Sequence, residues 1–146
     1  MIQLQKSFLV VLLLLLAFSQ TSCMNDDDDT PVNSECEKAV CTLVLITIEV
    51  SITDQDQKPV ALDSFIVINK DNGDDMTLTL SPTALNDAKE LGRYPLIQDG
   101  VLDINQKRNL QFKGYINNQE VVTSDYTVST DCCHVGLDTG NLELTL

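Results

Sequence analysis

The stretch TLVLITIEVSIT, residues 42–53, decides the fold class of this chain of 146 residues. Every second position holds a β-branched apolar side chain: Val44, Ile46, Ile48, Val50 and Ile52. Polar side chains fill positions between them: Thr47, Glu49, Ser51 and Thr53. Because successive side chains of a β-strand point to opposite faces, this alternation predicts a strand with one buried and one wet face.

Short apolar runs continue along the chain, and turn-forming residues separate them. The polar turn at residues 54–59 ends in Pro59, which prevents the first strand from simply continuing. We expect further strands at residues 64–69, 76–80, 94–98, 101–104, 109–116, 120–129 and 141–146. Short strands with turn signals roughly every 8 to 12 residues indicate an all-β fold, an antiparallel sandwich of about seven strands.

Two local signals stand out between these strands. Asn72-Gly73 indicates a hairpin, because both residues tolerate positive φ. Ser81 and Pro82 precede apolar residues with helical spacing, and Gly92 follows them. Ser is a common N-cap, Pro suits the first turn and Gly often ends a helix, so we expect a short helix here. A loop with a single helical turn fits these residues equally well.

Residues 1–22 are interpreted as a secretory signal peptide, with Lys6 followed by an apolar stretch at residues 8–18. Small residues then precede Cys23, which resembles the lipobox of bacterial lipoproteins, although Gln20 stands where that family usually has Leu. The resemblance implies cleavage before Cys23, lipidation of its thiol and anchoring in a membrane. The alternative is an ordinary secreted protein that keeps Cys23 as an odd thiol.

Residues 23–40 are predicted to form a lipidated acidic tether, and residues 41–146 the β-sandwich domain. Four consecutive Asp at residues 26–29 lie close behind Cys23. Such a run repels itself and extends a linker. It also resembles the acidic export signal that sends lipoproteins to the outer face of the outer membrane in one Gram-negative group. That resemblance implies display on the cell surface, with the periplasmic face as the alternative.

The segment IEVSITDQDQKPVAL, residues 48–62, resembles the opening of transthyretin-like (prealbumin-like) sandwiches related to carboxypeptidase regulatory domains. Gly92-Arg93-Tyr94 resembles the Gly-x-Tyr strand of that family. The resemblance implies an immunoglobulin/transthyretin-like sandwich, in a family whose modules are usually accessory, adhesive or spacer domains. The segment DCCHV, residues 131–135, resembles one in surface lipoproteins of the same bacterial group that have no assigned activity.

Four cysteines remain once Cys23 is assigned to lipid: Cys36, Cys41, Cys132 and Cys133. An even number in an exported chain predicts disulfide bonds. A vicinal bridge between Cys132 and Cys133 would strain the peptide between them, so we favour bridges from Cys36 and Cys41 to that pair. Either way of pairing them remains open.

A metal site is the rival interpretation of these cysteines. Together with His134 they offer soft thiolates and an imidazole, which suit Zn or Cu(I). Their spacing matches no standard ligand pattern, and an oxidising location favours disulfides, so we expect no metal and no other cofactor. The Asp-rich turns at residues 54–56 and 71–75 could offer oxygens to Ca²⁺ but lack the closing Glu of a Ca²⁺ loop. We interpret them as solvated turns.

The formal charge of −13 argues against nucleic acid as a partner, since little here could neutralise phosphates. No nucleophile elbow, zinc helix motif or glycine phosphate loop occurs in the sequence, so we expect no enzyme. The sequence predicts a lipid-anchored envelope protein that is structural or interacts with another envelope protein. The alternative is a small ligand- or metal-binding surface lipoprotein. No particular oligomeric state is predicted.

Overall fold

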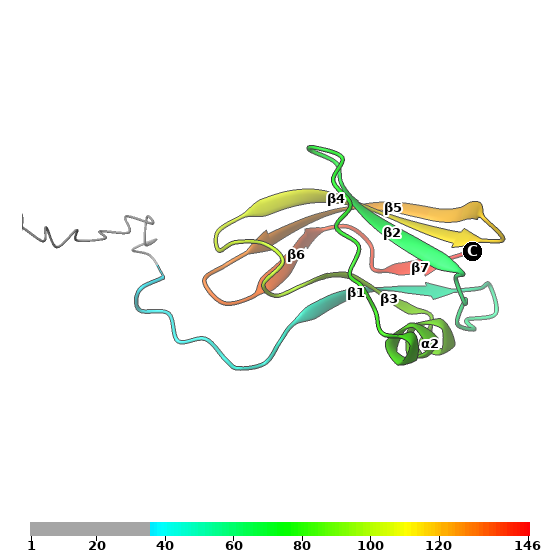
Figure 1. Ribbon diagram of the computed structural model, residues 1–146, viewed down its shortest axis with the longest axis horizontal. Helices are drawn as coiled ribbons and strands as arrows, with labels where there is room; N and C mark the ends of the chain where they lie inside the picture. The colour runs from blue at the N-terminus through cyan, green and yellow to red at the C-terminus, as the bar shows by residue number, and fades with distance from the viewer. Residues whose placement is uncertain (1–35) are drawn as a thin grey trace, which may run out of the picture. The chain divides into compact units, whose positions relative to one another are not determined.

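The computed structural model describes residues 36–146, which form two β-sheets packed on each other (Figure 1). The first sheet has the order β3-β1-β7, with β1 at Thr47–Thr53, β3 at Arg93–Gln98 and β7 at Glu143–Thr145. The second has the order β2-β4-β5-β6, with β2 at Ser64–Asn69, β4 at Lys107–Ile116, β5 at Gln119–Thr130 and β6 at Val135–Thr139. The predicted all-β sandwich of about seven strands is confirmed.

The predictions for residues 1–22, for lipidation of Cys23 and for most of the acidic tether lie outside the described residues. Among residues 36–146, no helix has the length and apolar character needed to cross a bilayer.

The core between the sheets follows the period-two pattern of β1. Ile48, Val50 and Ile52 are buried, as predicted. Opposite them the second sheet contributes apolar side chains that are wholly buried: Val67, Leu110, Phe112 and Val128. Burial of this kind stabilises a domain by roughly 25 cal/mol per Å² of apolar surface removed from water.

Tyr94 of β3 brings a hydroxyl into this core. Its oxygen accepts a hydrogen bond from the backbone N–H of Leu62 at 2.6 Å and donates one to the carbonyl of Val60 at 2.9 Å. Burial raises the pKa of Tyr94, and the hydrogen bond from Leu62 opposes that shift. The phenol therefore fastens the segment between β1 and β2 to the core.

The strand pairing is antiparallel with one exception. β7 runs parallel to β1, with Ser51 opposite Glu143 and Thr53 opposite Thr145. The expectation of an antiparallel sandwich thus holds for every other strand pair of the described residues. The longest pair is β4 with β5, joined by Asn117 and Asn118, which both have positive φ (52° and 61°). Asn tolerates this left-handed conformation better than most residues, so these two residues can form the tight turn between the strands.

The first predicted strand is shorter than its sequence pattern. β1 begins at Thr47, and residues 42–46 are not in a strand. Thr47 pairs with Gln98, the last residue of β3, and the next residue, Asp99, contacts Ile46 before the chain turns away at Gly100. Residues 42–45 therefore lack a partner strand, which the period of the sequence could not reveal.

Two other predicted strands do not form. Residues 76–80 follow an isolated bridge between Asp75 and Ile68 of β2, and the Met76 N–H donates to the carbonyl of Val67 at 2.8 Å. The hydroxyl of Thr77 then accepts the hydrogen bond of the Val67 N–H, so a side chain replaces the carbonyl that a ladder needs. Residues 101–104 are turns and bends. Gly73 still turns with φ of 82°, as expected for the Asn-Gly pair.

One strand was missed and the helix was found. β6 has only two apolar residues, Val135 and Leu137, so its own pattern is weak; it forms by pairing with the free edge of β5.

The helix α2 spans Pro82–Leu91, which decides against the alternative of a loop with a single helical turn. The Ser81 hydroxyl accepts from the Ala84 N–H at 3.2 Å, and Gly92 ends the helix with φ of 64°.

Candidate functional site

Two disulfide bonds join the first described residues to the turn between β5 and β6. Cys36 is bonded to Cys132 and Cys41 to Cys133, each pair with Cα atoms 5.2 Å apart. We call residues 36–46 the entry segment and residues 131–134 the cysteine turn. This is one of the two pairings between the cysteine groups that the sequence left open. The sulfurs are bonded to one another, so the thiolates that the metal alternative requires are not present.

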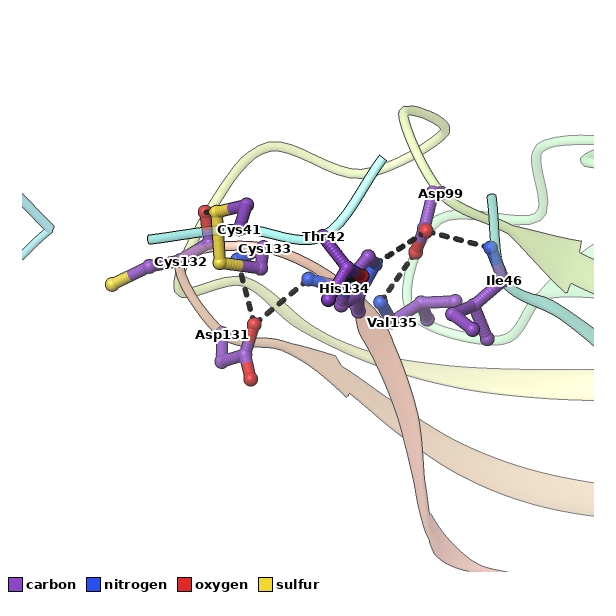
Figure 2. Close-up of polar contacts among 9 residues, drawn as sticks. All are labelled: Cys41, Thr42, Ile46, Asp99, Asp131, Cys132, Cys133, His134 and Val135. Carbon is purple, nitrogen blue, oxygen red and sulfur yellow. Dashed lines mark hydrogen bonds and ion pairs between the residues drawn. A yellow bond between two sulfur atoms is a disulfide. The ribbon is translucent and has the colours of Figure 1, made fainter. Parts of the chain in front are cut away.

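Asp131 shapes the cysteine turn. Its carboxylate oxygen Oδ1 accepts hydrogen bonds from the backbone N–H groups of Cys133 at 2.6 Å and His134 at 2.8 Å. Its own N–H donates to the carbonyl of His134 at 3.1 Å. The hydrogen bonds from the His134 and Cys133 N–H groups lower the pKa of Asp131. These hydrogen bonds fix the backbone of the cysteine turn, in which Cys133 is bonded to Cys41 of the entry segment (Figure 2).

His134 lies between Thr42 and Asp99 (Figure 2). Its Nε2 is 2.8 Å from the Thr42 hydroxyl, and its Nδ1 is 2.7 Å from Asp99 Oδ2. With the proton on Nδ1, the imidazole donates to Asp99 and accepts from Thr42. The three side chains thus link the entry segment, the cysteine turn and the end of β3.

Asp99 is the centre of this link. Besides His134, it accepts hydrogen bonds from the Ile46 N–H at 2.8 Å and the Val135 N–H at 2.7 Å. The backbone hydrogen bond from Ile46 contributes most to lowering the pKa of Asp99, and His134 and Val135 lower it further. Only 11% of the Asp99 side chain is exposed. One carboxylate therefore holds the start of β1 and the start of β6 together.

The order hydroxyl, imidazole, carboxylate is also that of a hydrolase triad, in which the imidazole takes a proton from the nucleophile. Here, however, the same contacts belong to a series of cross-links that starts at the two disulfides and joins the entry segment to the sandwich. We call this series the ladder. Cys41 is bonded to Cys133, Thr42 is hydrogen-bonded to His134, and the N–H groups of Ile46 and Val135 both donate to Asp99. Four cavities described in residues 36–146 are lined by other side chains. The arrangement fastens the entry segment along the sandwich.

Sequence reasoning found part of this site. It selected the four cysteines and His134, which the structure brings to one end of the sandwich. It missed Thr42, Asp99 and Asp131. The available signal for Asp99 is its position before Gly100 at the end of a predicted strand, a pattern that by itself indicates only a turn. Cys23 lies outside the described residues.

The Asp-rich turns direct carboxylates at their own backbone. Asp54 Oδ1 accepts from the N–H groups of Asp56 and Lys58, and Asp75 Oδ1 accepts from that of Thr77. The hydrogen bonds from Thr77 lower the pKa of Asp75. In these contacts the carboxylates of Asp54 and Asp75 stabilise the turns in which they lie.

The largest described cavity, about 420 Å³, lies between α2 and the wet face of the first sheet. Its walls combine charged and apolar side chains, among them Glu49, Asp87, Arg93, Leu80 and Leu91. It shares no residue with the disulfide end.

Comparison with known proteins finds no family model, no curated protein and no solved structure that matches the chain significantly. The class of the protein therefore follows from its fold and site: an all-β sandwich whose entry segment is tied by two disulfides to one end.

Proposed function

We propose that this chain is a lipid-anchored protein of the outer membrane, in which the β-sandwich serves as a structural or interaction module and not as an enzyme. The observation that carries the proposal is the pair of disulfides between the entry segment and the cysteine turn. Disulfides persist in oxidising compartments, which include the bacterial envelope and the cell surface. They join the sandwich to the chain where the tether that the sequence predicts, residues 23–40, ends.

The attachment would transmit force from the anchor to the body. Cys36 is 13 positions after Cys23 in the sequence. A pull on the tether would reach the sandwich through covalent bonds at Cys132 and Cys133 before it reached the hydrogen bonds of β1. This arrangement suits a module that is displayed at a distance from the membrane on an extended acidic linker.

Metabolic labelling with radioactive palmitate in a Gram-negative host tests the anchor. We expect wild-type protein to carry the label and Cys23→Ser to lose it. Cys36→Ser is the matched control and should keep the label, because Cys36 lies outside the lipobox. Labelling that persists in Cys23→Ser, or that is absent from wild type, would contradict lipidation. Digestion of a tagged protein by external protease on intact cells tests surface display, and full protection would place it on the periplasmic face.

We also propose that Thr42, His134 and Asp99 act as a fastening rather than as a nucleophilic triad. Supporting this, Asp99 also accepts two backbone hydrogen bonds that belong to the ladder. The purified chain should not hydrolyse p-nitrophenyl acetate faster than Thr42→Val does. Hydrolysis by wild type that Thr42→Val abolishes would instead indicate an acyl-transfer enzyme.

The cavity beside α2 favours the second candidate, a small-ligand-binding surface lipoprotein. Arg93 could contact a carboxylate, Glu49 and Asp87 could contact an ammonium group, and Leu80 and Leu91 offer apolar walls. Leucine is a suitable probe because it combines these three groups. Chemical-shift changes confined to the cavity and lost in Arg93→Ala would support binding, and unchanged spectra at millimolar leucine would count against it.

A further inference from the structure

The entry segment exposes a run of apolar side chains. Val40, Leu43, Val44 and Leu45 each keep at least 63% of their surface exposed. Two further large apolar residues of the described part are exposed, Leu91 on α2 and Ile104. We call residues 40–45 the apolar segment. Contiguous exposed apolar surface of this kind commonly marks an interaction site.

The cross-links at the disulfide end attach this segment to the surface of the sandwich, where its apolar side chains are exposed. Cys41 is bonded to Cys133, Thr42 is hydrogen-bonded to His134, and Ile46 is hydrogen-bonded to Asp99. These contacts attach both ends of residues 42–46 to the cysteine turn and to the end of β3. The apolar side chains of the segment are therefore exposed beside fixed covalent and polar contacts.

The backbone of the segment is ready for strand pairing. Its residues continue the β-branched pattern of β1, and residues 39–48 include no charged side chain. Within the described part of the chain, residues 42–45 make no backbone hydrogen bond. The chain bends at Leu43, and residues 44–46 lead from this bend into β1. Unpaired backbone groups on such an uncharged segment form a template to which a second strand adds.

The surroundings of the segment are mostly acidic. Glu37 and Asp131 flank the two disulfides and are exposed. Asp103 is exposed in the loop beside β5, where its carbonyl accepts from the Thr130 hydroxyl. Lys38 is the one basic residue in the entry segment. This rim complements a basic surface.

We propose that the apolar segment is a strand-addition site for the sheet edge of a different envelope protein, an edge flanked by basic side chains. The inference rests on the proposed envelope function and names the surface that performs the interaction. A second copy of this chain would bring acidic rim against acidic rim, and anionic lipid headgroups would meet the same repulsion. A basic-rimmed strand gains both backbone hydrogen bonds and charge complementarity.

Photo-crosslinking on intact cells tests the site. The photoreactive residue p-benzoylphenylalanine replaces Leu43 in the full chain, and a matched control places it at Leu91, another exposed leucine. We expect an adduct with one other protein from position 43 that is absent from position 91 and lost when Leu45→Asp is added. The crosslinked peptide should be an apolar strand flanked by Lys or Arg. Adducts with a second copy or with lipid, or no protein adduct beyond the control, would overturn the proposal.

Fluorescence separates a protein partner from the membrane. The chain has no Trp, so Leu43→Trp introduces a single reporter. In full-length lipidated protein, reconstituted into vesicles of phosphatidylethanolamine and phosphatidylglycerol, we expect the emission of a water-exposed indole. A blue shift would show insertion into the bilayer and overturn the proposal. If palmitate labelling succeeds while crosslinking fails, only the docking site is wrong; if labelling fails, the envelope proposal is wrong as well.

Discussion

The two halves of the alternating pattern in residues 42–53 differ in burial: the second half is in the core and the first half is exposed. Val44 and Val50 lie in the same period-two run of residues 42–53, yet Val50 is completely buried and Val44 is 63% exposed. The difference lies in the neighbours, because β3 accompanies the chain from Thr47 onward and turns away after Gln98. An apolar alternation therefore specifies a strand-forming segment, and the available partner strands decide how much of it is buried.

The largest effect should come from removing the bridges that hold the exposed half in place. The first bridge closes a loop of more than 90 residues, worth about 4.6 kcal/mol in the chain-entropy model. The second then closes only a small ring through residues 36–41 and 132–133, worth about 2.5 kcal/mol in the same model. Removing either pair by Cys→Ser should therefore cost about 2.5 kcal/mol, and removing all four cysteines about 7 kcal/mol.

Urea unfolding under non-reducing conditions measures these differences. The non-additivity is the specific expectation: the four-cysteine variant should lose more stability than the two paired variants combined. Equal, additive losses would contradict two bridges that join the same two short segments of the chain.

A matched pair of substitutions sharpens the comparison between the halves. Val50→Ala removes two methyl groups from the core and leaves a cavity, so the free energy of unfolding should fall by about 2 kcal/mol. Val44→Ala, on the same face of the pattern, should change it by less than about 0.5 kcal/mol. Comparable losses at both positions, measured by thermal or urea unfolding, would mean that the entry segment is buried in solution.

The boundary between the halves should respond to acid through Asp99. Its pKa is lower in the folded protein because of the hydrogen bonds from Ile46, His134 and Val135. A carboxyl group whose pKa is lower in the folded than in the unfolded protein stabilises the fold at pH values above the unfolded-state pKa. This stabilisation is lost as the pH falls through the folded-state pKa. Asp99→Asn should therefore melt at a lower temperature than wild type at neutral pH, and the gap should shrink below about pH 4. A gap that stays constant through that range would argue against the ionised carboxylate.

The smallest effect is expected at Thr42. Its hydrogen bond to His134 is exposed, so Thr42→Val should cost no more than about 0.5–1 kcal/mol. Unfolding measurements on this variant and on Thr42→Ser, which keeps the hydroxyl, separate the hydrogen bond from the packing of the side chain. A loss of several kcal/mol in Thr42→Val would mean that the fastening depends on this contact more than on the disulfides.

The sequence predicted much of the fold because local signals agreed with the tertiary structure. The buried face of β1, the strand β2 and the capped helix α2 all followed from periodicity and capping residues. Pairing partners were harder to predict. β7 runs parallel to β1, and β6 forms on the edge of β5 with little pattern of its own. Both depend on contacts between segments far apart in the sequence.

The sequence predicted that the cysteines of the candidate site form disulfide bonds, but not how the residues of the site are arranged. The even number of cysteines predicted bridges, but their pairing depends on the turn that Asp131 shapes. Asp99 and Thr42 are polar residues of ordinary appearance in the sequence. Both contact His134 only because the end of β3 lies beside the cysteine turn. Asp99 is 35 positions before His134 in the sequence, and Thr42 is 92 positions before it.

The pairing of the cysteines determines where the entry segment is attached to the sandwich. Trypsin cuts after Lys38 and so separates Cys36 from Cys41. In a Cys132→Ser variant, alkylation followed by digestion should label Cys36, whose partner is gone, and leave Cys41 bonded to Cys133. Label on Cys41 instead, or free thiols at both positions of the wild-type protein, would contradict this pairing.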